Sequence, residues 1–403
     1  YYLLTSVLYK SLYNESLLSR IYIVRSFSIV LTILTIFICY KIGKIIFSNS
    51  FQSILLSLIV SFQPMFIFSQ TGILPDPLTN LLFSIILFCC LKIITNKEYK
   101  QALMIVAFTV FLGLFTRQNI INSIPIILLA VIYNLRSKKQ YFVFTLSILL
   151  IIGSLILFTF KLPSIPVISR FRIPEIIEFD LKDITMASFG FYTISSFKHY
   201  FREILPWYFG VYKWLSLTLP PLSYRVINRL LLLSAIGFLV FIISAIKERQ
   251  FTKQVKLTSF MFFAVMMYFC IFIIWDYIFV LIHGFSFGIQ GRYFYPIIIF
   301  ITALVLTGLM TLINLFSFKA KKYIFPLIIF LVFLYNDYAL YFIANSYYDT
   351  SSIKIFLIQA SQYKPTILKG NIILIIIVIN VTIQLALLVK SIQLSQADIK
   401  KGE

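Results

Sequence analysis

The sequence predicts an all-α, polytopic transmembrane helix bundle with about eleven spans. Of the 403 residues, 60% are hydrophobic and only 12% are charged. Soluble domains are about half apolar and a quarter charged, so a water-soluble fold could not bury this much apolar surface. A bilayer accommodates it, because helices satisfy their backbone hydrogen bonds internally. The spacing of apolar segments and the alternation of charge between them support the same fold class.

Apolar segments recur along the whole chain. A helix needs roughly 20 apolar residues to cross the hydrocarbon core. We expect spans at residues 26–47, 51–71, 77–95, 101–116, 120–135, 141–160, 230–246, 257–282, 293–316, 323–344 and 372–391. The fourth and fifth segments are short and nearly contiguous, with Arg117 between them.

The connections between these segments fall into two alternating sets. The short, basic set comprises Lys41, Lys44, Lys97, Lys100, Arg136, Lys138, Lys139, Lys247, Arg249, Lys253, Lys256, Lys319, Lys321, Lys322, Lys400 and Lys401. The other set holds most of the acids, namely Asp76, Glu175, Glu178, Asp180, Asp183, Glu203 and Asp349. Excess Lys and Arg marks cytoplasmic loops, so we expect the basic side to be cytoplasmic, with the segment before Ser26 outside.

We expect a single transmembrane domain over residues 1–403. It divides into a core at 1–160, a large outer connection at 161–228, C-terminal spans at 229–393 and a cytoplasmic tail at 394–403. The outer connection is rich in aromatic residues, which argues against disorder. Its amphipathic stretch from Ile194 to Phe209 predicts helices that lie on the outer leaflet.

The formal net charge of +21 does not indicate nucleic-acid binding. The basic residues stand in short clusters between apolar runs, without the patch of interleaved aromatics that a nucleic-acid surface needs. The cysteines lie inside apolar runs without metal-ligand spacing, and they are Cys39, Cys89, Cys90 and Cys270. The bilayer is therefore the partner that the composition predicts.

Polar residues at the outer ends of the spans are candidates for a site. Asp76 either begins a helix before Pro77 or offers a carboxylate to a divalent cation such as Mg or Mn, or to a polar substrate. Arg117, followed by Gln118, either extends to the lipid headgroups or binds phosphate through its guanidinium fork.

The stretch HGFSFGIQGRYFYP is a further candidate on the predicted outer face. Gln290 and Arg292 immediately precede a span, and His283 begins the stretch. It is either a re-entry turn with an interfacial arginine and histidine, or a set of donors for the phosphate that Arg117 would also bind.

Two acids, Asp276 and Asp337, fall inside apolar segments. An acid within the membrane is costly and faces a partner or a cavity. We expect each of them to pair with an arginine of the outer face.

Asp76, Arg117 and Arg292 belong to three different outer connections at one membrane depth. A large amphipathic connection lies on the same face. Together they predict an outer-leaflet site for a ligand with a phosphorylated head and a lipid tail.

At these residues the chain resembles the GT-C superfamily of glycosyltransferases that use polyprenyl-phosphate sugars, in particular the protein mannosyltransferase and aminoarabinose transferase group. The similarity covers most of the chain. It rests on the start YYLLTSVLYKSLYNESLLSRIYIVRSFSIVLTIL, on Asp76 in PDPLTN, on Arg117 in FTRQN, and on the segments YFGVYKWLSLTLP and QGRYFYP.

The resemblance implies an inverting sugar transfer from a polyprenyl-phosphate donor at the outer face of a prokaryotic plasma membrane. Arg117 and Arg292 would hold the donor phosphate, and Asp76 would bind a cation or position the acceptor. The catalytic Asp of the family lies in a loop that would precede Tyr1. We therefore expect an N-terminally truncated chain, with about twelve spans in the full protein.

Other functions remain open at this point. A transporter or flippase for a lipid-linked or small polar substrate would place ionisable residues near the midplane of facing spans. Here they gather at the outer ends. A polymerase or ligase of surface polysaccharides would need similar outer-face chemistry, and a scaffold subunit would need none.

Overall fold

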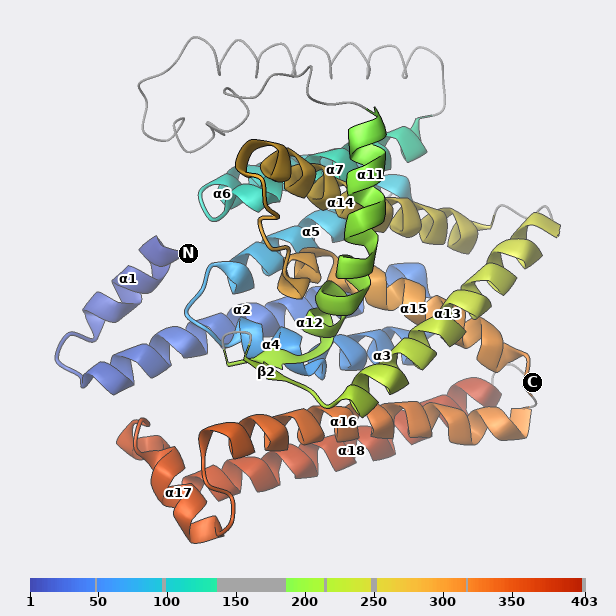
Figure 1. Cartoon of the computed structure of the whole chain (residues 1–403). Helices are drawn as coiled ribbons and strands as arrows, with labels where there is room; N and C mark the ends of the chain where they lie inside the picture. The colour runs from blue at the N-terminus through green and yellow to red at the C-terminus, as the bar shows by residue number, and fades with distance from the viewer. Residues whose placement is uncertain are drawn as a thin grey trace.

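The computed structural model describes the backbone of residues 1–47, 49–95, 99–135, 186–213, 216–247, 252–316 and 318–400. The described part of the chain is helical apart from one short hairpin (Figure 1). The prediction of an all-α membrane protein is confirmed.

The elements before the large connection are α1 (Tyr2–Ser11), α2 (Leu17–Ile46), α3 (Ser50–Ser61), α4 (Pro64–Gln70), α5 (Asp76–Ile94), α6 (Tyr99–Leu114), the 3-10 helix η1 (Gln118–Asn122) and α7 (Ser123–Asn134). Those after it are α11 (Met186–His199), the π-helix η3 (Tyr200–Ile204), α12 (Leu205–Gly210), β1 (Val211–Tyr212), β2 (Leu217–Thr218), α13 (Pro221–Lys247), α14 (Lys253–His283), η4 (Gly291–Ile297), α15 (Ile298–Asn314), α16 (Phe318–Tyr347), α17 (Ile353–Ser361), η5 (Thr366–Leu368) and α18 (Ile372–Lys400).

Seven helices of the described chain are long and apolar enough to cross a membrane, or eight if α3 and α4 are counted as one broken span. These two helices are bent by 64° at Pro64, which begins the second one. The apolar helices α6 and α7 are shorter. The expected span at 141–160 lies outside the described residues, so the count of eleven stays a prediction.

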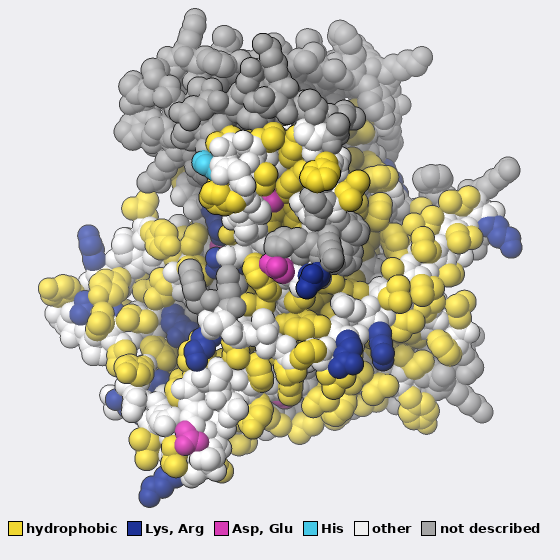
Figure 2. Space-filling model, viewed as in Figure 1, with side chains coloured by type: hydrophobic (Ala, Val, Ile, Leu, Met, Phe, Trp, Pro, Cys, Tyr) yellow, Lys and Arg dark blue, Asp and Glu magenta, His cyan; other side chains and the backbone are white. Residues whose placement is uncertain are grey.

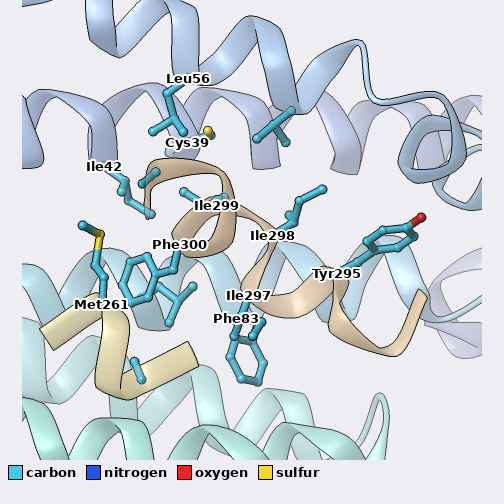
Figure 3. Packing of buried hydrophobic residues seen from close by; sticks show 14 of the residues in the cluster. Cys39, Ile42, Leu56, Phe83, Met261, Tyr295, Ile297, Ile298, Ile299 and Phe300 are labelled. Carbon is cyan, nitrogen blue, oxygen red and sulfur yellow. The ribbon is translucent and has the colours of Figure 1, made fainter. Parts of the chain in front are cut away.

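The bundle is organised around α5 and α15. In α5, 78% of the best apolar window is buried inside the protein, against 11% in α13 and α18. Figure 3 shows Phe83 of α5, Met261 of α14 and Phe300 of α15 packing towards one another beneath α2 and α3. Hydrophobic side chains cover much of the visible surface (Figure 2), as a lipid-facing surface requires.

Small residues allow α13 and α15 to pack backbone to backbone. A Cβ added at Gly237 would lie 2.0 Å from the carbonyl oxygen of Gly308, and Ser234 Oγ donates to the Val305 carbonyl at 2.9 Å. Close contact through small residues is the usual way that helices associate in lipid.

We therefore expect Gly237→Ala to destabilise the protein by about 1–3 kcal/mol, because the nearest atom belongs to the Gly308 backbone, which cannot rotate away. Thermal unfolding of the purified protein measures the effect. Gly190→Ala in α11 is the matched control, since its added Cβ meets nothing within 4 Å. Equal melting temperatures for the two variants would show that the contact does not hold these helices together.

The expectation that Ile194–Phe209 lies on the leaflet surface is wrong for its C-terminal part. Ile204 and Tyr208 are buried, because α12 packs against α4 and η4. The Tyr208 carbonyl accepts hydrogen bonds from Gln63 Nε2 at 2.7 Å and from Tyr295 Oη at 2.8 Å. The aromatic residues of this segment belong to the protein core.

Two predicted boundaries also change. Helix α13 begins at Pro221, inside the connection that was expected to extend to 228. The tail expected at 394–403 is helical as far as Lys400, because α18 continues past its apolar part. Figure 1 shows α16 and α18 side by side, with α17 beyond their shared end.

Candidate functional site

Asp76 and Arg117 meet at one end of the bundle, called here the Asp76 end. Asp76 is the first residue of α5, and Pro77 follows it in the first turn. Arg117 stands between α6 and η1 in an extended conformation, with φ −159° and ψ 140°. A guanidinium nitrogen of Arg117 forms an ion pair with a carboxylate oxygen of Asp76.

Arg292 belongs to η4, and its guanidinium stands beside the ring of Tyr293, as that of Arg117 does. The Arg117 Cζ lies 6.0 Å from the centre of this ring, and the Arg292 Cζ lies 5.8 Å from it. Cations are attracted to an aromatic ring at such distances. The Tyr293 backbone is fixed by Tyr268 Oη, which donates to its carbonyl at 3.0 Å.

The site carries more positive than negative charge. Two guanidinium groups stand beside the Tyr293 ring, and one of them, that of Arg117, is paired with the Asp76 carboxylate. Burial lowers the pKa of Arg117, and the nearby charge of Arg292 lowers it further, although an arginine stays protonated at neutral pH. Arg292 Nε is buried without a hydrogen-bond partner among the described residues. A bound anion would neutralise the two guanidinium charges and accept a hydrogen bond from Arg292 Nε.

The structure also contains an apolar groove of about 200 Å³. Its lining includes Tyr200, Leu231, Phe269 and Phe294, from η3, α13, α14 and η4. Phe294 follows Tyr293 in the chain, and the rings of both residues contact Phe272, at 5.3 and 6.0 Å between centroids. A charged end beside an apolar groove suits an amphiphilic ligand.

The contacts described for the other predicted phosphate donors lie away from this arginine pair. His283 ends α14, and its ring contacts in the described chain are Phe279, at 4.2 Å between centroids, and Phe285. Gln290 precedes η4 and accepts from Tyr293 N through its carbonyl at 3.0 Å. The backbone of Gln118 begins η1, and its side chain is outside the described part.

The expected pairing of the intramembrane acids with arginines is wrong. Asp276 accepts hydrogen bonds from Tyr192, Ser286 and the backbone of Phe287. Asp337 Oδ1 accepts from Gln384 Nε2 of α18 at 2.8 Å. Neutral donors satisfy both carboxylates within the bundle, so neither needs a cation.

The residues present do not fit a divalent metal at Asp76. Mg²⁺ and Mn²⁺ take several oxygen ligands. The described residues contain no group of three or more His, Cys, Asp and Glu that could hold a metal ion. The Asp76 carboxylate is already engaged by Arg117. We infer that the Asp76 carboxylate orients the guanidinium of Arg117.

The sequence reasoning missed the importance of Tyr293. Its ring is the surface beside which both arginines stand. Phe272 and Phe287 lie parallel to it, with centroids at 6.0 and 5.8 Å. The neighbouring Arg-Tyr-Phe-Tyr run in a glycine-flanked turn was the available signal.

The fold and this site define a polytopic helical membrane protein with a cationic, aromatic site at one end of its bundle. The chain belongs to a family described as predicted membrane protein (DUF2142), whose profile matches residues 1–301. Asp76, Arg117 and Arg292 all lie within the matched region. No curated protein and no solved structure matches the chain.

Proposed function

We propose that the protein is a membrane glycosyltransferase that takes its sugar from a polyprenyl-phosphate donor at the outer face. Arg117 and Arg292 bind the donor phosphate, and the first isoprene units of the donor occupy the apolar groove. The Asp76 end is then the outer face, in agreement with the distribution of basic connections. The GT-C resemblance, which includes PDPLTN, FTRQN and QGRYFYP, supports this proposal.

The convergence of two arginines on Tyr293 carries the proposal. They come from connections far apart in the sequence, yet both Cζ atoms lie within 6.0 Å of one ring centre. Among the described residues, the carboxylate seen in an ion pair with them is that of Asp76, which contacts Arg117. Bringing two cations together is unfavourable unless an anion joins them, and the guanidinium fork matches phosphate.

In such a transfer the anomeric carbon exchanges its bond to a phosphate oxygen for a bond to the acceptor oxygen, and the acceptor hydroxyl gives its proton to a carboxylate base of the kind that the GT-C resemblance implies. The electron pair of the broken bond passes to the phosphate, whose negative charge therefore grows. Arg117 and Arg292 would stabilise this charge, because fixed donors act most strongly where charge develops. Asp76 would hold Arg117 in position.

The binding of farnesyl phosphate to the protein in nanodiscs of zwitterionic lipid tests the site. Arg292→Gln should weaken binding about 10- to 100-fold, because a hydrogen bond from a charged donor contributes about 1.5–3 kcal/mol. Arg225→Gln, at an exposed position of α13, is the matched control and should leave the affinity unchanged.

Farnesol provides the second control, because it has the same chain without the phosphate. Its binding should be equal in wild type and Arg292→Gln. If Arg292→Gln bound farnesyl phosphate as well as wild type does, or if Arg225→Gln lost as much affinity, the arginine pair would not be the phosphate site.

A further inference from the structure

A short strap covers the arginine site. It comprises residues 284–290, between α14 and η4, and contains two glycines in the left-handed region, Gly284 at φ 77° and Gly288 at φ 79°. Only glycine adopts this conformation without strain. The strap is exposed over most of its length, but Ile289 is only 1% exposed.

Asp276 fastens the middle of this strap to α14. Ser286 Oγ donates to the two carboxylate oxygens at 2.8 and 3.0 Å, and Phe287 N donates to Oδ1 at 2.8 Å. Tyr192 Oη of α11 donates to Oδ2 at 2.5 Å. Both oxygens accept hydrogen bonds, so the carboxylate anchors the strap.

The anchored strap lies directly on the site. The Phe287 ring is parallel to Tyr293 within 6°, with 5.8 Å between centroids. Tyr293 is the ring beside which Arg117 and Arg292 stand. Lifting the strap would therefore uncover the ring that the two arginines share.

The same carboxylate is linked to the groove. The hydroxyl groups of Tyr192 and Tyr200 are 3.2 Å apart, and Tyr200 lines the groove. A chain that enters the groove contacts Tyr200, and the hydroxyl pair connects this residue to the carboxylate that holds the strap.

We propose that Asp276 is a positioning residue, whose carboxylate holds the strap closed over Tyr293 and thereby controls access to the arginine site. The identity of the ligand rests on the proposed function. The position of the strap does not, so the two can be tested separately.

The accessibility of Ile289 tests the strap without any ligand. We would replace the native cysteines, introduce Ile289→Cys, and measure the labelling rate with a membrane-impermeant maleimide in nanodiscs. Asp276→Asn and Ser286→Ala should each raise this rate about tenfold, since each removes hydrogen bonds to a charged group. Ser286 is exposed on the strap, so its substitution leaves helix α14 intact.

Asp337→Asn is the matched control, because it makes the same change at the other intramembrane acid, on α16. Its labelling rate should equal that of the unmodified reporter. Unchanged labelling in both Asp276→Asn and Ser286→Ala would overturn the proposal. Equally fast labelling in Asp337→Asn would do so as well, because it would indicate general loosening.

Farnesyl phosphate then separates the strap from the ligand. Ser286→Ala should increase both its association and its dissociation rates about tenfold, with little change in affinity, as expected for a gate. Faster labelling with unchanged ligand rates would overturn the gating role. Faster labelling in a protein that does not bind farnesyl phosphate at all would support the anchor and overturn the proposed function.

Discussion

Gly291→Ala should unfold the Asp76 end of the bundle and abolish ligand binding. A Cβ at this position would lie 2.1 Å from the backbone nitrogen of Tyr208 and 2.5 Å from the carbonyl carbon of Trp207. Backbone atoms of α12 cannot rotate away as a side chain can. We expect a destabilisation of about 3 kcal/mol, at the upper end for overpacked cores.

The effect should be large because Gly291 begins η4, the helix that carries Arg292 and Tyr293. The same contact seats Tyr208, whose carbonyl accepts from Gln63 and Tyr295. Displacing α12 would break those hydrogen bonds and move both the arginine and the groove wall.

Thermal unfolding and farnesyl phosphate binding measure both consequences. Gly72→Ala, also at the Asp76 end, is the matched control, since its Cβ would lie 3.3 Å from the Leu74 side chain and 3.6 Å from the Ser69 carbonyl oxygen, without a backbone clash. A Gly291→Ala protein that melts and binds like the Gly72→Ala protein would show that α12 does not pack directly on η4.

Opposite substitutions of the ion pair should change phosphate affinity in opposite directions. Asp76→Asn removes the negative charge paired with Arg117, while the Asn side-chain oxygen can still accept a hydrogen bond from that guanidinium. It should therefore tighten binding several-fold, by about 1 kcal/mol for a partly exposed pair. Arg117→Gln removes a cation and leaves the carboxylate to repel phosphate, so binding should fall more than about 100-fold.

A titration of farnesyl phosphate at several salt concentrations measures this pair of effects. The difference in phosphate affinity between the two variants should decrease as the salt concentration rises, because dissolved ions screen the charges of the site. Both variants lose the ion pair between Asp76 and Arg117. Each variant is therefore the control for the structural effect of that loss in the other. Weaker binding in both variants to the same degree would assign the pair a purely structural role.

The fold class was predictable because lipid imposes a simple pattern on sequence. Long apolar segments separated by charged connections fit few folds other than a helical membrane bundle. Most of the predicted spans in the described chain coincide with helices of the structure. The bend at Pro64 was missed because the apolar run continues through it, so composition does not reveal the break. Helix α13 begins before the span that was predicted from the apolar residues, because Pro221 starts the helix ahead of them.

The site was predictable in part. Depth along the spans indicated that Asp76, Arg117 and Arg292 share one face, and the structure places them together. The partners of Asp276 could not be predicted, because they come from a strap ten residues away and from Tyr192 on another helix. The burial of Tyr208 was missed since an amphipathic pattern is the same beside a leaflet and beside a core.

Photoaffinity mapping tests the central claim most directly. Two farnesyl phosphate analogues would carry a diazirine, one next to the phosphate and the other at the far end of the chain. We predict that the first labels residues adjoining Arg117 and Tyr293, and that the second labels the groove lining, including Tyr200 and Leu231. Labelling by the phosphate-proximal analogue at the opposite end of the bundle, near Lys44 or Lys256, would contradict the account.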